Sequence, residues 1–164
     1  MRLGIKFAVM FVAAFTIVSD ASEETVFADV FSHYEAIRLV LIEDSTDGVA
    51  AHAASIAAAA EGLEQSFSAA SAGVGPEDAA AVEALLPEVV EGAKAVSAAK
   101  DLDSTRDALA ELTKPLVRWQ DLIEGPRPVV AYCPMVKKAW LQPDEAIGNP
   151  YAPSMLRCGE VVQR

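Results

Sequence analysis

Residues 48–67 read GVAAHAASIAAAAEGLEQSF, and this stretch decides the fold. Val49, Ile56 and Leu63 recur every seven residues, which is the spacing of one apolar stripe on a helix that packs against other helices. The many alanines make this helix slim, so that neighbouring helices can approach it closely. The stretch therefore predicts a helix inside a helical bundle.

Three further segments have the same helical spacing of apolar residues, and they span residues 25–44, 77–99 and 104–123. Pro87 is expected to kink or split the second of them, and Pro115 to bend the third. The sequence Ser-Thr-Arg-Asp at 104–107 resembles a capping box at the start of the last helix, and Gly125-Pro126 ends that helix. Four amphipathic helices with short connections predict an all-α fold, an antiparallel up-down four-helix bundle over residues 22–125.

The first 21 residues have the pattern of a signal peptide. Arg2 and Lys6 make the start basic, an apolar run follows over residues 7–18, and Ser19-Asp20-Ala21 offers small residues for cleavage. A run of 12 residues is too short to span a bilayer, for which about 20 are needed. We therefore expect a periplasmic or secreted protein that is not inserted in a membrane once residues 1–21 are removed.

Charge and motifs exclude several classes of function. The chain has 13 basic and 24 acidic side chains, so nucleic acid and anionic membrane surfaces are poor partners for it. It has no haem-attachment motif, no redox Cys-x-x-Cys pair and no glycine-rich phosphate loop. Residues 126–164 also contain no histidine that would activate a cysteine nucleophile, so we expect no enzyme.

Residues 126–164 form a tail of different composition. Six of the nine prolines lie there, and they prevent a long helix. Residues 129–132 and 160–162 are rich enough in β-forming residues to predict short strands that pair as the tail folds back. We expect this proline-rich tail to pack as an irregular cap on the bundle, within the same domain.

The tail also holds all the sulfur of the chain after the predicted leader. Cys133-Pro-Met135 and Met155-Leu-Arg-Cys158 each place a methionine within three residues of a cysteine. A soft, thiophilic ion such as Cu(I) needs thiolate and thioether donors close together. This clustering favours a Cu(I) site with Cys133 and Cys158 as primary ligands and Met135 and Met155 as secondary ligands.

A disulfide between Cys133 and Cys158 is the competing hypothesis. It would close a loop of about 25 residues and stabilise the tail by roughly 3 to 4 kcal/mol, and an oxidising compartment favours it. The oxidised form can be a resting state and the reduced form the metal binder. A disulfide needs no methionine, although methionines can also fill gaps in a core. His33 and His52 border the predicted core, and we expect both to be packing residues rather than ligands.

The tail carries a family resemblance as well. It rests on five motifs: Tyr132-Cys133-Pro134-Met135, Trp140-Leu141, Asn149-Pro150-Tyr151, Met155 and Cys158-Gly159-Glu160-Val161. In these the chain resembles a poorly characterised exported helical domain, a domain of unknown function that occurs alone or at the C-terminal end of periplasmic adaptor subunits of copper and silver efflux pumps. The segments between Met135 and Trp140 and between Tyr151 and Met155 are shorter than in that pattern, and Pro153 replaces a glycine.

The resemblance implies heavy-metal handling in the periplasm, with Cu(I), or Ag(I) as its analogue, as the ion and a copper efflux component of the cell envelope as a partner. Together with the sulfur cluster, it leads us to expect a protein that binds Cu(I) and buffers it or delivers it to efflux. The alternative is a disulfide-stapled helical interaction module that binds no metal.

Overall fold

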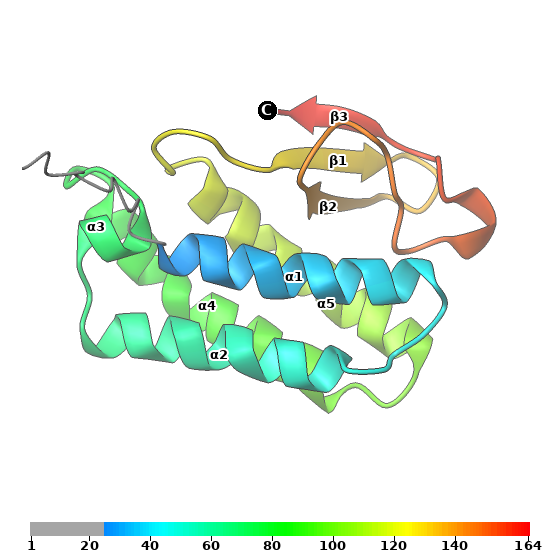
Figure 1. Cartoon of the computed structure of the whole chain (residues 1–164), viewed down its shortest axis with the longest axis horizontal. Coiled ribbons are helices and arrows are strands. Elements are labelled where there is room, and N and C mark those ends of the chain that lie inside the picture. The colour runs from blue at the N-terminus through cyan, green and yellow to red at the C-terminus, as the bar shows by residue number, and fades with distance from the viewer. Residues whose placement is uncertain (1–24) are drawn as a thin grey trace, which may run out of the picture.

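Four long helices and a small sheet make up the part of the chain that the computed structural model describes, residues 25–164 (Figure 1). The predicted signal peptide lies outside these residues. The long helices are α1 (Val26–Ile42), α2 (Val49–Gln65), α4 (Ala79–Ala98) and α5 (Leu102–Gln120). The shorter elements are a helical turn α3 (Ala69–Ala72), the strands β1 (Val129–Cys133), β2 (Lys138–Gln142) and β3 (Glu160–Gln163), and a 3-10 turn η1 (Pro153–Met155).

The apolar stripe of α2 is buried, as its spacing predicts. Val49, Ile56 and Leu63 all lie in the hydrophobic core, and α2 packs against both α1 and α4. Helix α4 packs in turn against α5, where Gly92 allows a close approach: a Cβ atom at this position would lie 3.1 Å from the Cα atom of Leu112. Small residues therefore set the spacing between these helices. No helix within residues 25–164 has the length and apolar character to cross a membrane.

Helix α5 begins before the predicted capping box. Asp101 is the N-cap residue: its carboxylate accepts a hydrogen bond from the backbone N–H of Ser104 at 2.8 Å, and its own N–H donates to the Ser104 hydroxyl. The predicted box at 104–107 is therefore wrong, because Asp101 offers a carboxylate to the free N–H groups at the helix start. The hydrogen bond from the Ser104 backbone N–H, with a contribution from the Ser104 side chain, holds the pKa of the Asp101 carboxyl below its usual value.

Neither internal proline divides its helix. Pro87 lies within α4 and Pro115 within α5, so of the two alternatives expected at Pro87, a kink or a split, the split is wrong. A proline frees the carbonyl four residues earlier, which belongs to Glu83 in α4 and to Glu111 in α5. Both glutamates are exposed, so water can bind the freed carbonyls and each helix continues.

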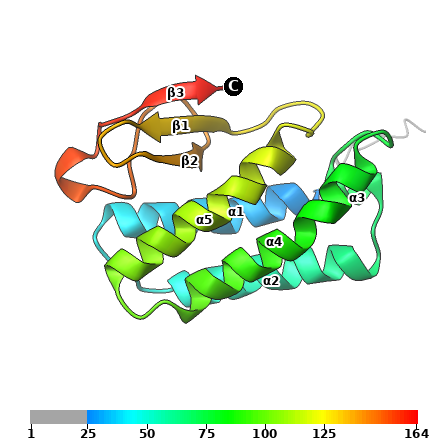
Figure 2. The same ribbon diagram turned by 180° about the vertical axis from the view of Figure 1, so that it is seen from behind.

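The tail is more regular than the predicted irregular cap. Strand β1 pairs antiparallel with β3, which confirms the two predicted strands and their pairing. A third strand, β2, was not predicted; it pairs with β1 over five residues and gives the strand order β2-β1-β3. The molecule is therefore mostly helical with a small antiparallel sheet, and the prediction of an all-α fold holds only in part. Both views place the sheet over α1 and α5, with α2 and α4 on the far side (Figures 1 and 2).

Two buried arginines attach the tail to the helices. Arg106 of α5 donates to the carbonyl oxygens of Pro150 at 2.8 Å and Leu41 at 2.9 Å, and it pairs with the Asp44 carboxylate at 2.6 Å. Arg38 of α1 donates to the carbonyl oxygen of Gly148 at 2.6 Å and is held by Glu35. These charge-assisted hydrogen bonds fix the segment that leads into η1.

A buried chain of hydroxyl groups makes a second attachment. The Thr113 hydroxyl donates to the Leu109 carbonyl, so Tyr34 is the donor in its 2.8 Å hydrogen bond to Thr113. The Tyr34 oxygen also accepts from the Leu141 N–H of β2 at 3.3 Å, and Tyr151 donates to the Ala139 carbonyl at 3.0 Å. Burial raises the pKa of Tyr34 to about 12, so this phenol stays protonated and able to donate at physiological pH.

Candidate metal site

Cys133 and Cys158 are joined by a disulfide, with their Cα atoms 5.6 Å apart. Cys133 is the last residue of β1 and is fully buried, whereas Cys158 lies just before β3 and is partly exposed. Because β1 and β3 are neighbours in the sheet, backbone pairing also holds the two cysteines close together. The structure thus joins the two predicted primary ligands to each other.

Met135 lies in the tight turn that follows Cys133. The backbone N–H of Lys137 donates to the Cys133 carbonyl at 2.8 Å and closes this turn, and Lys137 takes a left-handed conformation with φ of 56°. Met135 is 71% exposed, the highest value among the exposed large hydrophobic side chains of residues 25–164. Its side chain therefore does not fill a gap in the core.

Met155 has a matching position beside the other cysteine. It ends η1, and the backbone N–H of Cys158 donates to the Met155 carbonyl at 2.8 Å. Met155 is 36% exposed. Each methionine thus shares a hydrogen-bonded turn with its own cysteine, and the disulfide connects the two turns.

Trp140 covers the backbone beside Cys158. The indole is fully buried, its N–H donates to the side-chain oxygen of Gln142 at 2.7 Å, and a Cβ atom at Gly159 would lie 2.6 Å from the ring. Gly159 has φ of 148°, a conformation that other residues rarely adopt. Close packing against this ring therefore requires a glycine at position 159, whatever the neighbouring cysteine binds.

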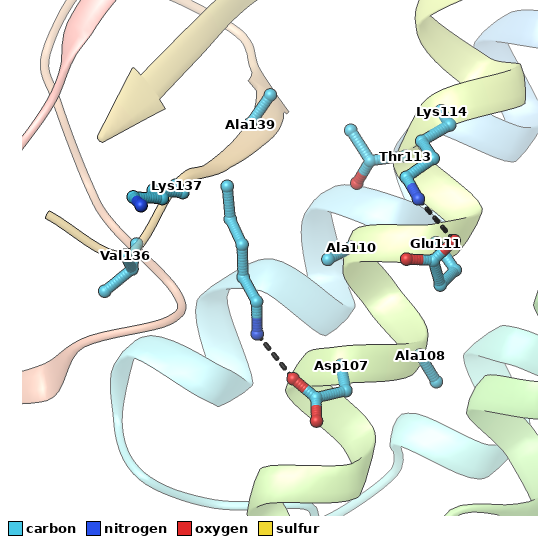
Figure 3. A pocket seen from close by; sticks show the side chains of 10 residues that line it. Asp107, Ala108, Ala110, Glu111, Thr113, Lys114, Val136, Lys137 and Ala139 are labelled. Carbon is cyan, nitrogen blue, oxygen red and sulfur yellow. Dashed lines mark hydrogen bonds and ion pairs between the residues drawn. The ribbon is translucent and has the colours of Figure 1, made fainter. Parts of the chain in front are cut away.

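An open groove of about 550 Å³ runs between α5 and the turn that carries Met135 (Figure 3). Lys138 pairs with Asp107 across the groove, and Lys114 pairs with Glu111 along α5. Sequence analysis did not identify this groove, because its walls are about 30 residues apart in the chain. Its charged groups are largely matched to one another, so they leave no concentrated field for a charged ligand.

Exposed apolar side chains gather in the tail. Four of the five large hydrophobic side chains that are exposed in residues 25–164 belong to it: Met135, Met155, Leu156 and Val162. Three of these side chains, those of Met135, Met155 and Leu156, lie within three residues of one of the two disulfide-bonded cysteines. The two turns joined by the disulfide are therefore the candidate functional surface.

The donor set of this surface is soft. Within residues 25–164 no group of three or more histidine, cysteine or carboxylate side chains is arranged to hold a metal ion. Two cysteines, when reduced, and two thioethers are donors that suit Cu(I). A scan of protein-family models and searches of curated proteins and of solved structures find no match to this chain.

Proposed function

We propose that this is an exported protein that binds Cu(I) and buffers it or passes it to a copper efflux component of the cell envelope. In the reduced protein, Cys133 and Cys158 are the primary ligands, and Met135 and Met155 are secondary ligands. Ag(I) is a soft ion of the same charge and takes the same site. The observation that carries the proposal is that each exposed methionine shares a turn with one cysteine.

The exposure of the methionines argues against a packing role. Burying a methionine side chain contributes roughly 1.5 to 3 kcal/mol, and a side chain that stays in water contributes little of this. Met135 is the clearer case because it is 71% exposed at the tip of a turn. A soft donor at the surface, next to a cysteine, is better explained by a role in metal binding than by a role in packing the core.

The site requires reduction of the disulfide before it can bind the ion. One dithiol, or two thiols in succession, reduces the bond through a mixed disulfide: the reductant leaves as a disulfide, and the two cysteines take up two electrons and two protons. Cys158 is the accessible sulfur, because Cys133 is fully buried. Binding of Cu(I) then releases the thiol protons to solvent, so affinity rises with pH.

The arrangement of the helices supports a rigid platform for this site. We infer an antiparallel up-down four-helix bundle over residues 22–125, with residues 126–164 in the same domain. Contacts between α1 and α2, α2 and α4, and α4 and α5 support this topology, because neighbours in the chain are also neighbours in space. The resemblance of the tail to the helical domain of copper and silver efflux adaptors supports the periplasmic location.

A competition experiment tests the proposal. The reduced protein without its leader is titrated with Cu(I) under anaerobic conditions against a chromophoric chelator. Met135→Leu and Met155→Leu should each weaken binding, and the double variant should weaken it further, because a soft donor is lost while side-chain volume is kept. Leu156→Ala is the matched control: its side chain is about as exposed as Met155 but carries no sulfur. Equal affinity in all these proteins would contradict the mixed-sulfur site.

The second candidate function is a disulfide-stapled interaction module that binds no metal. The disulfide itself and the exposed apolar residues of the tail favour it, since a stapled sheet with an apolar surface suits docking to another protein. On this hypothesis Cys133→Ser lowers the melting temperature without altering copper tolerance of the cell. On the copper hypothesis the same variant also loses tight Cu(I) binding.

A further inference from the structure

Two histidines meet on the opposite side of α1 from the sheet. Nδ1 of His33 in α1 lies 3.0 Å from Nδ1 of His52 in α2, with ring centroids 5.2 Å apart and ring planes inclined by 46°. Both residues are half-buried in the contact between the two helices, which faces away from β1 to β3 (Figure 1). The expectation that both histidines are packing residues leaves this close approach of two ring nitrogens unexplained.

The protons of this pair are constrained by a nearby carboxylate. Two neutral imidazoles make an Nδ1 to Nδ1 hydrogen bond only if one Nδ1 carries the proton and the other offers its lone pair. The Oδ1 atom of Asp29 lies 3.8 Å from Nε2 of His33, which is too far for a direct hydrogen bond but favours a proton on that nitrogen electrostatically. In that tautomer His33 accepts at Nδ1 and His52 donates.

This arrangement is also the one found around metal-binding histidines. Such a histidine directs its second ring nitrogen to a carboxylate, which fixes the tautomer and makes the ligating nitrogen more basic. Asp29 lies on the corresponding side of His33, with its Oδ1 atom 3.8 Å from Nε2. For His52 to ligate as well, its proton needs only to move from Nδ1 to Nε2, so the neutral pair binds an ion without losing a proton overall.

We propose that His33 and His52 form a site for a divalent transition-metal ion that prefers imidazole nitrogen, with Cu(II) as the best fit. With bonds of about 2.0 Å, two adjacent nitrogens lie roughly 2.8 Å apart around a square-planar ion and roughly 3.3 Å apart around a tetrahedral one. The observed 3.0 Å lies between these values. In the hydrogen-bonded pair each nitrogen points along the line that joins the two, so each ring has to turn by roughly 35 to 45° to direct its lone pair at one ion. Cu(II) also ranks above Zn(II) in affinity for nitrogen ligands.

The site is open. Among residues 25–164 no third histidine, cysteine, aspartate or glutamate joins the pair to complete a metal-binding group, so water fills the remaining positions. An ion held by two protein ligands and water exchanges readily, which suits capture rather than permanent storage. The excess of acidic side chains, with a net charge of −11, raises the local concentration of cations around the molecule.

This inference does not depend on the proposed Cu(I) site. The histidine site uses nitrogen donors on another face, and it does not depend on whether the cysteines are reduced or form the disulfide. The test therefore uses the oxidised protein, with the disulfide verified by intact mass so that sulfur cannot contribute. Cu(II) is titrated in and followed by electron paramagnetic resonance, where one equivalent with two nitrogen ligands is expected.

Variants identify the ligands. His33→Gln and His52→Gln should each abolish the two-nitrogen spectrum, and Asp29→Asn should weaken binding by about 10-fold or more through loss of the carboxylate partner. Glu43→Gln is the control, because it removes the same charge near the end of α1 without touching either histidine. The double histidine variant gives the background from the chain terminus and from surface carboxylates.

A measurement on the unaltered protein covers the case in which a variant fails to fold. Paramagnetic broadening by substoichiometric Cu(II) should affect the ring signals of both histidines before any other proton signals in the NMR spectrum. Binding no stronger than in the double variant, a spectrum unchanged by either single variant, or broadening elsewhere that spares the histidines would each overturn the proposal.

Discussion

Reduction of the disulfide is expected to lower the free energy of unfolding by about 3.5 kcal/mol. The bond joins residues separated by 25 positions, and closing a loop of this length removes about 12 cal/mol/K of entropy from the unfolded chain, which gives that energy near 298 K. Residues 25–164 are expected to unfold with an entropy near 0.29 kcal/mol/K, so the melting temperature should fall by about 12 °C.

The native contacts of the tail should survive this change. Cys133 remains buried as a thiol, and the pairing of β1 with β3 and the two arginine attachments do not depend on the bond. A domain of this size has a free energy of unfolding of about 5 to 15 kcal/mol, which is larger than the loss expected on reduction of the disulfide. The reduced protein is therefore expected to stay folded at 25 °C, which the proposed Cu(I) site requires.

The assay is thermal unfolding followed by circular dichroism, with and without a phosphine reductant, and with the thiol count read by alkylation and intact mass. The double variant Cys133→Ala with Cys158→Ala is the control, because its melting temperature should not respond to the reductant. A fall of less than about 3 °C would show that the bond does not constrain the unfolded chain as reasoned. Unfolding at 25 °C on reduction would refute the claim that the native contacts of the tail survive without the disulfide.

Three further changes test the fold. Arg106→Met should lower the free energy of unfolding, measured in urea, by about 3 kcal/mol, because buried carbonyl groups lose their hydrogen-bond donor. Arg118→Met, at an exposed position, should change it by less than about 1 kcal/mol. Equal effects of the two variants would contradict the attachment of the tail by Arg106. The pKa of Tyr34 is about 12 in the folded protein, against an ordinary value of 10.0, so its contribution to stability is intact below pH 10 and falls by roughly 2 kcal/mol as pH rises to 12. Tyr34→Phe should remove that loss when melting is followed as a function of pH, and an unchanged slope would refute the reasoning. Gly159→Ala should destabilise the protein by about 2 kcal/mol or more, because Gly159 has a positive φ and the Trp140 indole fills the space that a Cβ atom would need. Gly62→Ala in α2 should stabilise the protein by up to about 1 kcal/mol. If chemical denaturation gave changes of the same sign for both variants, it would contradict this reasoning.

The long helices could be predicted because their apolar spacing is a local property. The segment predicted at 48–67 is α2 from Val49 to Gln65, and the one at 25–44 is α1 from Val26 to Ile42. The start of α5 was less certain from sequence because Asp101 and Ser104 are both good capping residues, and only the hydrogen bonds show that the aspartate is the cap.

The sheet could be predicted only in part. Strands β1 and β3 contain runs of β-branched residues, whereas β2 reads Lys-Ala-Trp-Leu-Gln and becomes a strand because β1 offers it a partner. The sulfur atoms of the candidate site could be identified from sequence, but their state could not, since the disulfide depends on the register of β1 and β3. The contact between His33 and His52 depends on how α1 and α2 are rotated against each other, which no local pattern specifies.

Copper X-ray absorption spectroscopy on the Cu(I)-loaded, reduced protein tests the central proposal most directly. The account predicts a copper first shell made only of sulfur, with fewer sulfur scatterers in Met135→Leu and Met155→Leu, and release of the ion when Cys133 and Cys158 are reoxidised. A shell of nitrogen or oxygen, or a reduced protein that retains no copper after desalting, would contradict the account and favour the stapled interaction module.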